Sequence, residues 1–80
     1  MSRRRGRLQM IKEILELLAK CGRTKTEIIR RANLNFYKGQ EILDFLMEKG
    51  LITKSSEKYS ITDKGKDFLE KLRELDEFMI

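Results

Sequence analysis

The spacing of apolar residues changes twice along this chain, and each change constrains the fold. Between residues 8 and 49 apolar positions recur at steps of three and four, the period of an amphipathic α-helix. From residue 51 to 61 the pattern resembles a β-hairpin, and after Thr62 the helical period returns. We therefore expect a mainly α protein with a small β-hairpin in its second half.

Two helices are expected first, each with its own boundary signals. The first begins at about Leu8 and ends before Gly22, because glycine favours positions just past a helix end. The second begins after Thr24 and closes near Asn33, since Thr24 and Glu27 have the spacing of a capping box.

A third helix is expected from Asn35, an N-cap residue type, to Lys49, with Gly50 as its stop. Gly39 would lie on its buried stripe and would let a neighbouring helix approach closely, at a cost of about 1 kcal/mol in helix propensity. The alternative is that Gly39 breaks the segment and the helix begins only at Gln40. The expected inward residues are Gly39, Ile42, Leu43 and Leu46.

The hairpin is expected to bury Ile52, Tyr59 and Ile61 on one face, and Thr62 then begins a last helix. The chain thus divides into a basic N-terminal arm (1–7), a helical domain with its hairpin (8–62) and a C-terminal helix (63–80). The last helix has a heptad-like apolar seam. We assign five residues of this helix to a homodimer interface: Phe68, Leu72, Leu75, Phe78 and Met79. Phe68 and Leu69 should also pack on their own domain, whereas the other four should lie beyond its core.

Two motifs frame the hairpin: Gly50-Leu51-Ile52 before it and Tyr59-Ser60-Ile61-Thr62-Asp63-Lys64-Gly65 at its end. With the order of the elements, they resemble the small winged helix-turn-helix transcriptional regulators and chromatin-associated proteins common in archaea. The resemblance implies a three-helix core plus wing, with an additional C-terminal helix that pairs two subunits through a coiled coil. It is more specific for fold than for function, because each motif residue also has a structural reason.

The net charge of +5 is unevenly distributed. Residues 1–40 contain 11 basic and 3 acidic residues, whereas residues 41–80 contain 7 and 10. A basic first half favours an anionic partner, and nucleic acid is the commonest large one. We expect double-stranded DNA as the partner and a cytoplasmic, nucleoid-associated protein.

The composition argues against other function classes. The chain has one cysteine and no histidine, which excludes disulfide frameworks, common zinc sites and histidine-based catalysis. No glycine-rich phosphate loop is present. Apolar runs of at most three residues exclude a membrane span, which needs about 20. We expect no enzyme, no cofactor and no small-molecule ligand.

Candidate DNA-binding residues follow from the helix-turn-helix geometry, in which the first turns of the third helix lie closest to the bases. Lys38 and Gln40 are of types that contact guanine, phosphate or adenine. Phe36 and Tyr37 have a competing interpretation as core residues, which we favour more for Phe36. The candidates are Asn35, Tyr37, Lys38 and Gln40 on this helix, Lys25 and Thr26 before it, Lys54, Ser55, Ser56 and Lys58 in the wing, and Arg3, Arg4, Arg5 and Arg7 in the arm.

Two functions remain open at this point. The first is a homodimeric transcriptional regulator or chromatin-type protein that binds DNA non-covalently. The second is a protein-interaction module without DNA binding, for which the acidic residues Glu41, Asp44 and Glu48 argue. RNA is the less favoured nucleic acid, because no exposed aromatic platform is evident.

Overall fold

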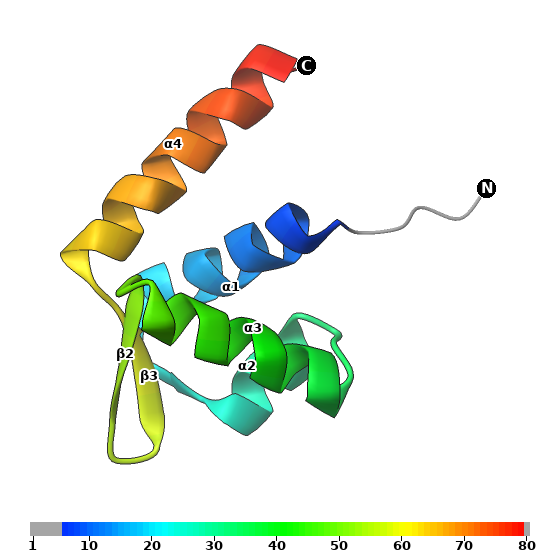
Figure 1. Ribbon diagram of the computed structural model, residues 1–80, viewed down its shortest axis with the longest axis vertical. Coiled ribbons are helices and arrows are strands. Elements are labelled where there is room, and N and C mark those ends of the chain that lie inside the picture. Colours follow the sequence, from blue (N-terminus) through cyan, green and yellow to red (C-terminus); the bar gives the residue numbers. More distant parts are fainter. Residues whose placement is uncertain (1–5, 80) are drawn as a thin grey trace.

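The computed structural model describes residues 6–79, with side chains up to residue 78, and its elements follow the predicted order with one added strand. Figure 1 shows the three-helix body, the hairpin beside it and the last helix rising away from both. The elements are α1 (Arg7–Lys20), β1 (Arg23–Thr24), α2 (Lys25–Arg31), α3 (Phe36–Glu48), β2 (Ile52–Ser55), β3 (Lys58–Ile61) and α4 (Asp63–Met79). The predicted fold class is confirmed.

The capping box predicted at the start of α2 is present. Thr24 Oγ1 accepts from the backbone N–H of Glu27 at 3.3 Å, and the backbone N–H of Thr24 donates to Glu27 Oε1 at 3.0 Å. This second hydrogen bond lowers the pKa of Glu27 below its ordinary value, against an opposing effect of desolvation. The carboxylate therefore stays ionised and holds the helix start in place.

The start of α3 settles the two alternatives for Gly39. Asn35 is the N-cap, and its Oδ1 accepts from the backbone N–H of Lys38 at 2.7 Å, so the helix runs through Gly39. A Cβ added at Gly39 would lie 2.7 Å from Ile29 Cγ1 of α2. The predicted close approach of a neighbouring helix is confirmed.

The small sheet has the strand order β1-β3-β2, with antiparallel pairs. Lys58 of β3 pairs with Ser55 of β2 on one side and with Thr24 of β1 on the other. Ile52 and Tyr59 are buried as predicted, whereas Ile61 is only partly buried against the same core. The sequence did not indicate β1, because two residues carry no periodicity.

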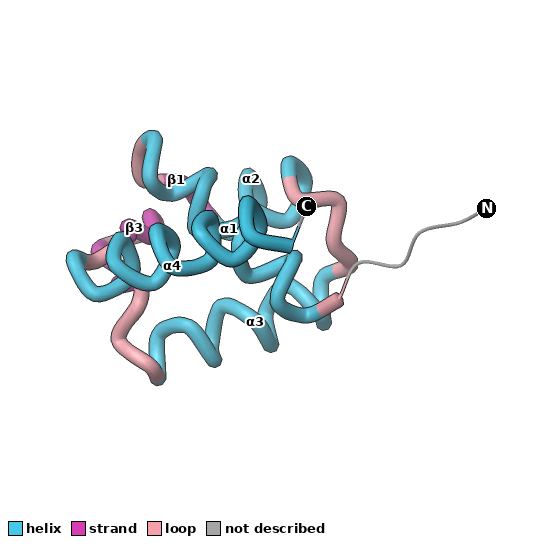
Figure 2. The backbone as a smooth tube through the Cα atoms, turned by 90° about the horizontal axis from the view of Figure 1, so that it is seen from above, coloured by secondary structure: helices cyan, strands magenta, loops and turns pink. Residues whose placement is uncertain are grey.

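The last helix is anchored more deeply than predicted. α4 lies above α1 in Figure 1 and overlaps it in the view of Figure 2, and two ion pairs join the helices, Lys12 with Asp76 and Arg73 with Glu16. Leu72 is only 6% exposed, so the prediction that it lies beyond the core was wrong. The reason is that α1 extends far enough to cover this turn of α4. Phe68 is half-buried against the same core.

Candidate nucleic-acid interface

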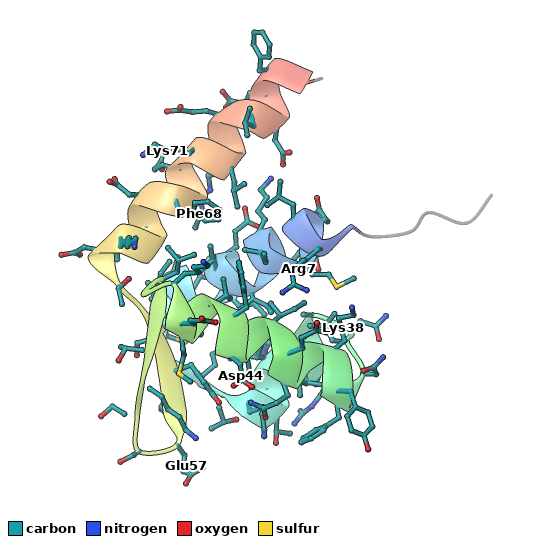
Figure 3. All side chains as sticks on the ribbon, viewed as in Figure 1. Arg7, Lys38, Asp44, Glu57, Phe68 and Lys71 are labelled. Carbon is teal, nitrogen blue, oxygen red and sulfur yellow. The ribbon has the colours of Figure 1, made fainter. Side chains whose placement is uncertain are left out.

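The wing and the helix-turn-helix elements meet at one end of the molecule. In Figure 1 the hairpin loop, α2 and the start of α3 lie at the end opposite the last turns of α4. The pairing of Thr24 with Lys58 holds the wing beside the start of α2. The wing candidates Lys54, Ser55, Ser56 and Lys58 are all exposed. Glu57, at the wing tip in Figure 3, adds one carboxylate among them.

Lys25 connects α2 with α3. Its Nζ donates to Gln40 Oε1 at 2.6 Å and lies 4.6 Å from the centroid of the Phe36 ring. Gln40 Nε2 in turn donates to Asp44 Oδ1 at 2.9 Å. Both polar ends of the Gln40 amide are thus engaged within the protein, so contact with a base would have to replace these bonds. Thr26, one residue further along α2, is exposed.

Arg7 and Lys38 both approach Glu41. Arg7 Nη1 and Lys38 Nζ each lie 3.6 Å from a Glu41 oxygen, and the Arg7 guanidinium is 4.9 Å from the Phe45 ring centroid. Figure 3 shows Arg7 and Lys38 at the same end of α3. Arg7, predicted as the last residue of the basic arm, is instead the first residue of α1, and its side chain reaches α3.

Carboxylates interrupt the exposed side of α3. Glu41, Asp44 and Glu48 are exposed and follow one another at steps of three and four, which places them on one face. Asp44 lies midway along the helix in Figure 3. A phosphate backbone would be repelled along this face, so a DNA contact has to concentrate on the first turn of α3, on α2 and on the wing.

The two aromatic residues at the start of α3 are on the surface. Phe36 is 56% and Tyr37 86% exposed, with ring centroids 6.2 Å apart and planes at 83°. The interpretation that Phe36 closes the core was wrong, and so was the expectation that no exposed aromatic platform exists. The turn before α3 directs both side chains outward, and their apolar type alone gave no sign of it.

The sequence also gave too little weight to Arg30. Together with Lys25 and Phe36 it lines an open hollow of about 320 Å³ between α2 and α3. The available signal was the four-residue spacing of Thr26 and Arg30, which places them on one face of α2. The hollow is lined by Lys25, Thr26, Ile29, Arg30, Asn33, Leu34 and Phe36.

Several predicted positions have other outcomes. The Asn35 side chain caps α3, as described above. Arg3, Arg4, Arg5 and the Met79 side chain lie outside the described residues. Within residues 6–78, no group of three histidine, cysteine or acidic side chains is arranged to hold a metal ion. None of the helices in the described part of the chain has the length and apolar character needed to cross a bilayer.

Comparison with known proteins decides the family. Residues 4–79 match the family described as winged helix-turn-helix. The chain belongs to this family. Its helix-turn-helix is formed by α2 and α3, and its wing by β2 and β3. The predicted archaeal resemblance is confirmed by a relative from Methanocaldococcus jannaschii, the uncharacterized protein MJ0287, which is 36% identical over 76 residues. That match spans 95% of this chain and 78% of the relative.

Solved structures share the winged-helix fold. ZitR of Lactococcus lactis superimposes with a TM-score of 0.72 at 22% identity, over 88% of this chain and 49% of ZitR. CalO1, a methyltransferase in calicheamicin biosynthesis, has a TM-score of 0.62 at 20% identity, over 74% of this chain and 18% of CalO1. This chain thus spans about half of ZitR and a smaller part of CalO1, and at these identities the matches show the fold alone.

Proposed function

We propose that this winged helix-turn-helix protein binds double-stranded DNA as a homodimer and acts as a transcriptional regulator associated with the nucleoid in the cytoplasm. The observation that carries the proposal is the position of the wing, α2 and the start of α3 at one end of the molecule. Lys25 at the start of α2 and Lys54 and Lys58 in the wing belong to this end, whereas Lys38 in the first turn of α3 lies beside Glu41 and Arg7. The protein does this by binding alone, without catalysis.

In this proposal the first turn of α3 enters the major groove. Tyr37, Lys38 and Gln40 face the bases, and Gln40 exchanges its bond with Lys25 for one to a base edge. Phosphates are contacted by Lys25, Thr26 and Arg30 on α2, by Lys54, Ser55, Ser56 and Lys58 in the wing, and by the basic residues at 3–5. Phosphate contacts supply affinity and orientation, whereas base contacts supply sequence preference.

The homodimer is proposed to form through the last turns of α4. Leu75 is 53% and Phe78 86% exposed there, and Leu8 on α1 is exposed beside Leu75, where the two line one shallow hollow. A contiguous exposed apolar surface of this kind is typical of an interface. A second copy would place two α3 helices at a fixed separation, which suits two half-sites on one duplex.

The test is a salt titration of DNA binding by fluorescence anisotropy, between about 50 and 200 mM salt. The double variant Lys25→Ala/Lys58→Ala should lower the slope of log affinity against log salt by about two, because each lost phosphate contact removes about one released ion. The matched control is Lys66→Ala/Lys71→Ala, which removes the same charge from exposed positions on α4 and should leave the slope unchanged.

Two results would contradict the proposal. One is the absence of binding by micromolar wild-type protein even at the lower salt concentration. The other is an equal effect of the two double variants, which would mean that charge acts without regard to position. Equal effects would favour the second candidate, a protein-interaction module that uses the acidic face of α3 formed by Glu41, Asp44 and Glu48.

A further inference from the structure

The exposed rings of Phe36 and Tyr37 at the start of α3 have no role in the core. Large apolar side chains that are exposed next to each other are typical of a binding surface. The two ring planes stand at 83°, with centroids 6.2 Å apart. Perpendicular rings cannot both slide into one gap between stacked bases, so this pair offers one flat face supported edge-on by the other ring.

The hollow beside Phe36 has the chemistry that a nucleotide requires. Ile29 and Leu34 contribute apolar lining, whereas Lys25 and Arg30 contribute positive charge. Its volume of about 320 Å³ is at the lower end of the range for ligand pockets. Lys25 Nζ lies 4.6 Å from the Phe36 centroid, so a cation and an aromatic ring are already next to each other. An apolar surface bordered by cations suits a planar base joined to a phosphate.

The acidic face of α3 limits which form of DNA can reach these rings. Asp44 and Glu48 disfavour a duplex that lies along the length of the helix, because its phosphates would pass these carboxylates. Glu41 is paired with Arg7 and Lys38. A base that has left the stack can instead reach the first turn of α3 while its flanking duplex stays near α2 and the wing.

We propose that this site binds one unpaired base of DNA. Tyr37, the more exposed ring, lies outside the lining of the hollow and supplies the stacking face. Phe36 connects it with the hollow, because its ring centroid is 6.2 Å from that of Tyr37 and 4.6 Å from Lys25 Nζ. Lys25 and Arg30 hold the phosphate of the same nucleotide. The inference rests on the proposed function in one respect, that the partner is DNA, and it adds a preference for DNA with an unpaired base.

The test compares three DNAs of one sequence: a perfect duplex, the duplex with a single thymine bulge, and the duplex with an abasic residue in the bulge. The two bulged DNAs have the same number of phosphates and the same charge, and they differ in the presence of the bulged base. Wild-type protein should bind the thymine bulge about tenfold more tightly than the abasic one, because stacking of one base on an aromatic side chain contributes about this much affinity. Tyr37→Leu should reduce this ratio to about one, whereas Tyr37→Phe should preserve it, because leucine keeps apolar bulk without an aromatic face.

Tyrosine emission gives an independent reading. The chain has two tyrosines and no tryptophan, and Tyr59 is buried in the core, so a binding-dependent change reports on Tyr37. The thymine bulge should quench the emission more than the abasic bulge does. Tyr37→Phe should abolish the difference in quenching and retain the difference in affinity. Circular dichroism checks that the variants fold. We expect them to fold, because the Tyr37 side chain is exposed.

The outcomes separate the two proposals. Equal affinity for the two bulges, together with binding to the perfect duplex, would overturn the base site and leave the proposed function standing. A tenfold ratio that survives in Tyr37→Leu would also overturn the site. Binding to none of the three DNAs would overturn both proposals.

Discussion

The helices α3 and α4 both carry an apolar stripe, but they bury it to different extents. In α3 the whole stripe, from Gly39 to Leu46, is enclosed. In α4 Leu69 and Leu72 are buried, whereas Leu75 and Phe78 are exposed. The cause is the set of neighbours: α3 packs against α2 and β2, whereas Leu75 of α4 lies beside the first turn of α1, where Leu8 is itself 53% exposed. A stripe is therefore buried only where neighbouring elements cover it from more than one side.

The exposed apolar residues of the two helices also differ in their charged surroundings. Phe36 at the start of α3 lies next to Lys25, and Tyr37 lies next to Phe36. Phe78 at the end of α4 is flanked in sequence by Asp76 and Glu77. Similar apolar exposure thus suits different partners: cations favour a phosphate-bearing ligand, and carboxylates favour another protein surface.

The largest effect should come from replacing Gly65, in the first turn of α4, with alanine. A Cβ at Gly65 would collide with the backbone carbonyl oxygen of Leu51 and lie 2.7 Å from Ile61 Cγ1. A backbone carbonyl cannot move away as a side chain can, so Gly65→Ala should lower the free energy of unfolding by about 3 kcal/mol. At Gly39 the obstacle is the Ile29 side chain, which can move, and alanine regains helix propensity. Gly39→Ala should therefore cost about 1 kcal/mol.

Urea denaturation of the two glycine variants measures this difference. A larger loss for Gly39→Ala would show that the contact of α4 with Leu51 and Ile61 is looser than the α2–α3 contact. That result would reverse the comparison of the two helices.

The next effect concerns self-association. Leu75→Glu/Phe78→Glu should raise the dissociation constant of the proposed homodimer more than about tenfold, because charge replaces an apolar contact. The fold of each subunit should be retained, since both residues are exposed. Sedimentation velocity over a concentration series measures the change.

The matched control for self-association is Tyr37→Glu, which places a charge at an aromatic residue of the same 86% exposure on α3. It should leave self-association unchanged. A wild-type protein that stays monomeric at high micromolar concentration, or a control that dissociates equally, would refute the assignment of the interface to α4.

The last comparison concerns the residues that precede the two helices. Asn35→Ala removes one acceptor for the backbone N–H of Lys38 and should cost about 1 kcal/mol. Thr62→Ala should cost about 2 kcal/mol, at the upper end for helix caps. Its hydroxyl accepts from the Gly65 N–H and also lies within hydrogen-bond distance of the Gly50 and Leu51 carbonyl oxygens. Thermal denaturation compares the two, and the opposite order would mean that the start of α4 is held by packing alone.

Much of the fold could be predicted because its signals are local. Thr24 with Glu27 marked α2, Asn35 marked α3, and Gly50 marked the change from helix to strand. The depth of Leu72 could not be predicted in this way, since it depends on how far α1 extends beside α4 in space.

The candidate site was less predictable. Residue type and helical phase located Lys38 and Gln40 on α3, but the bond between Lys25 and Gln40 joins residues 15 positions apart on different helices. The exposure of Phe36 depends on the path of the turn before α3, and an apolar residue type suggests the opposite. The DNA-binding role of each candidate and the dimer interface on α4 stay predictions.

The two-residue strand β1 has a mechanical consequence. Thr24 pairs with Lys58 through its backbone and caps α2 through its side chain, so the hairpin is tied to the first turn of the helix-turn-helix. A force that bends the tip of the hairpin therefore has to tilt α2 as well. A displacement of the wing should therefore be transmitted to α2 through this pairing.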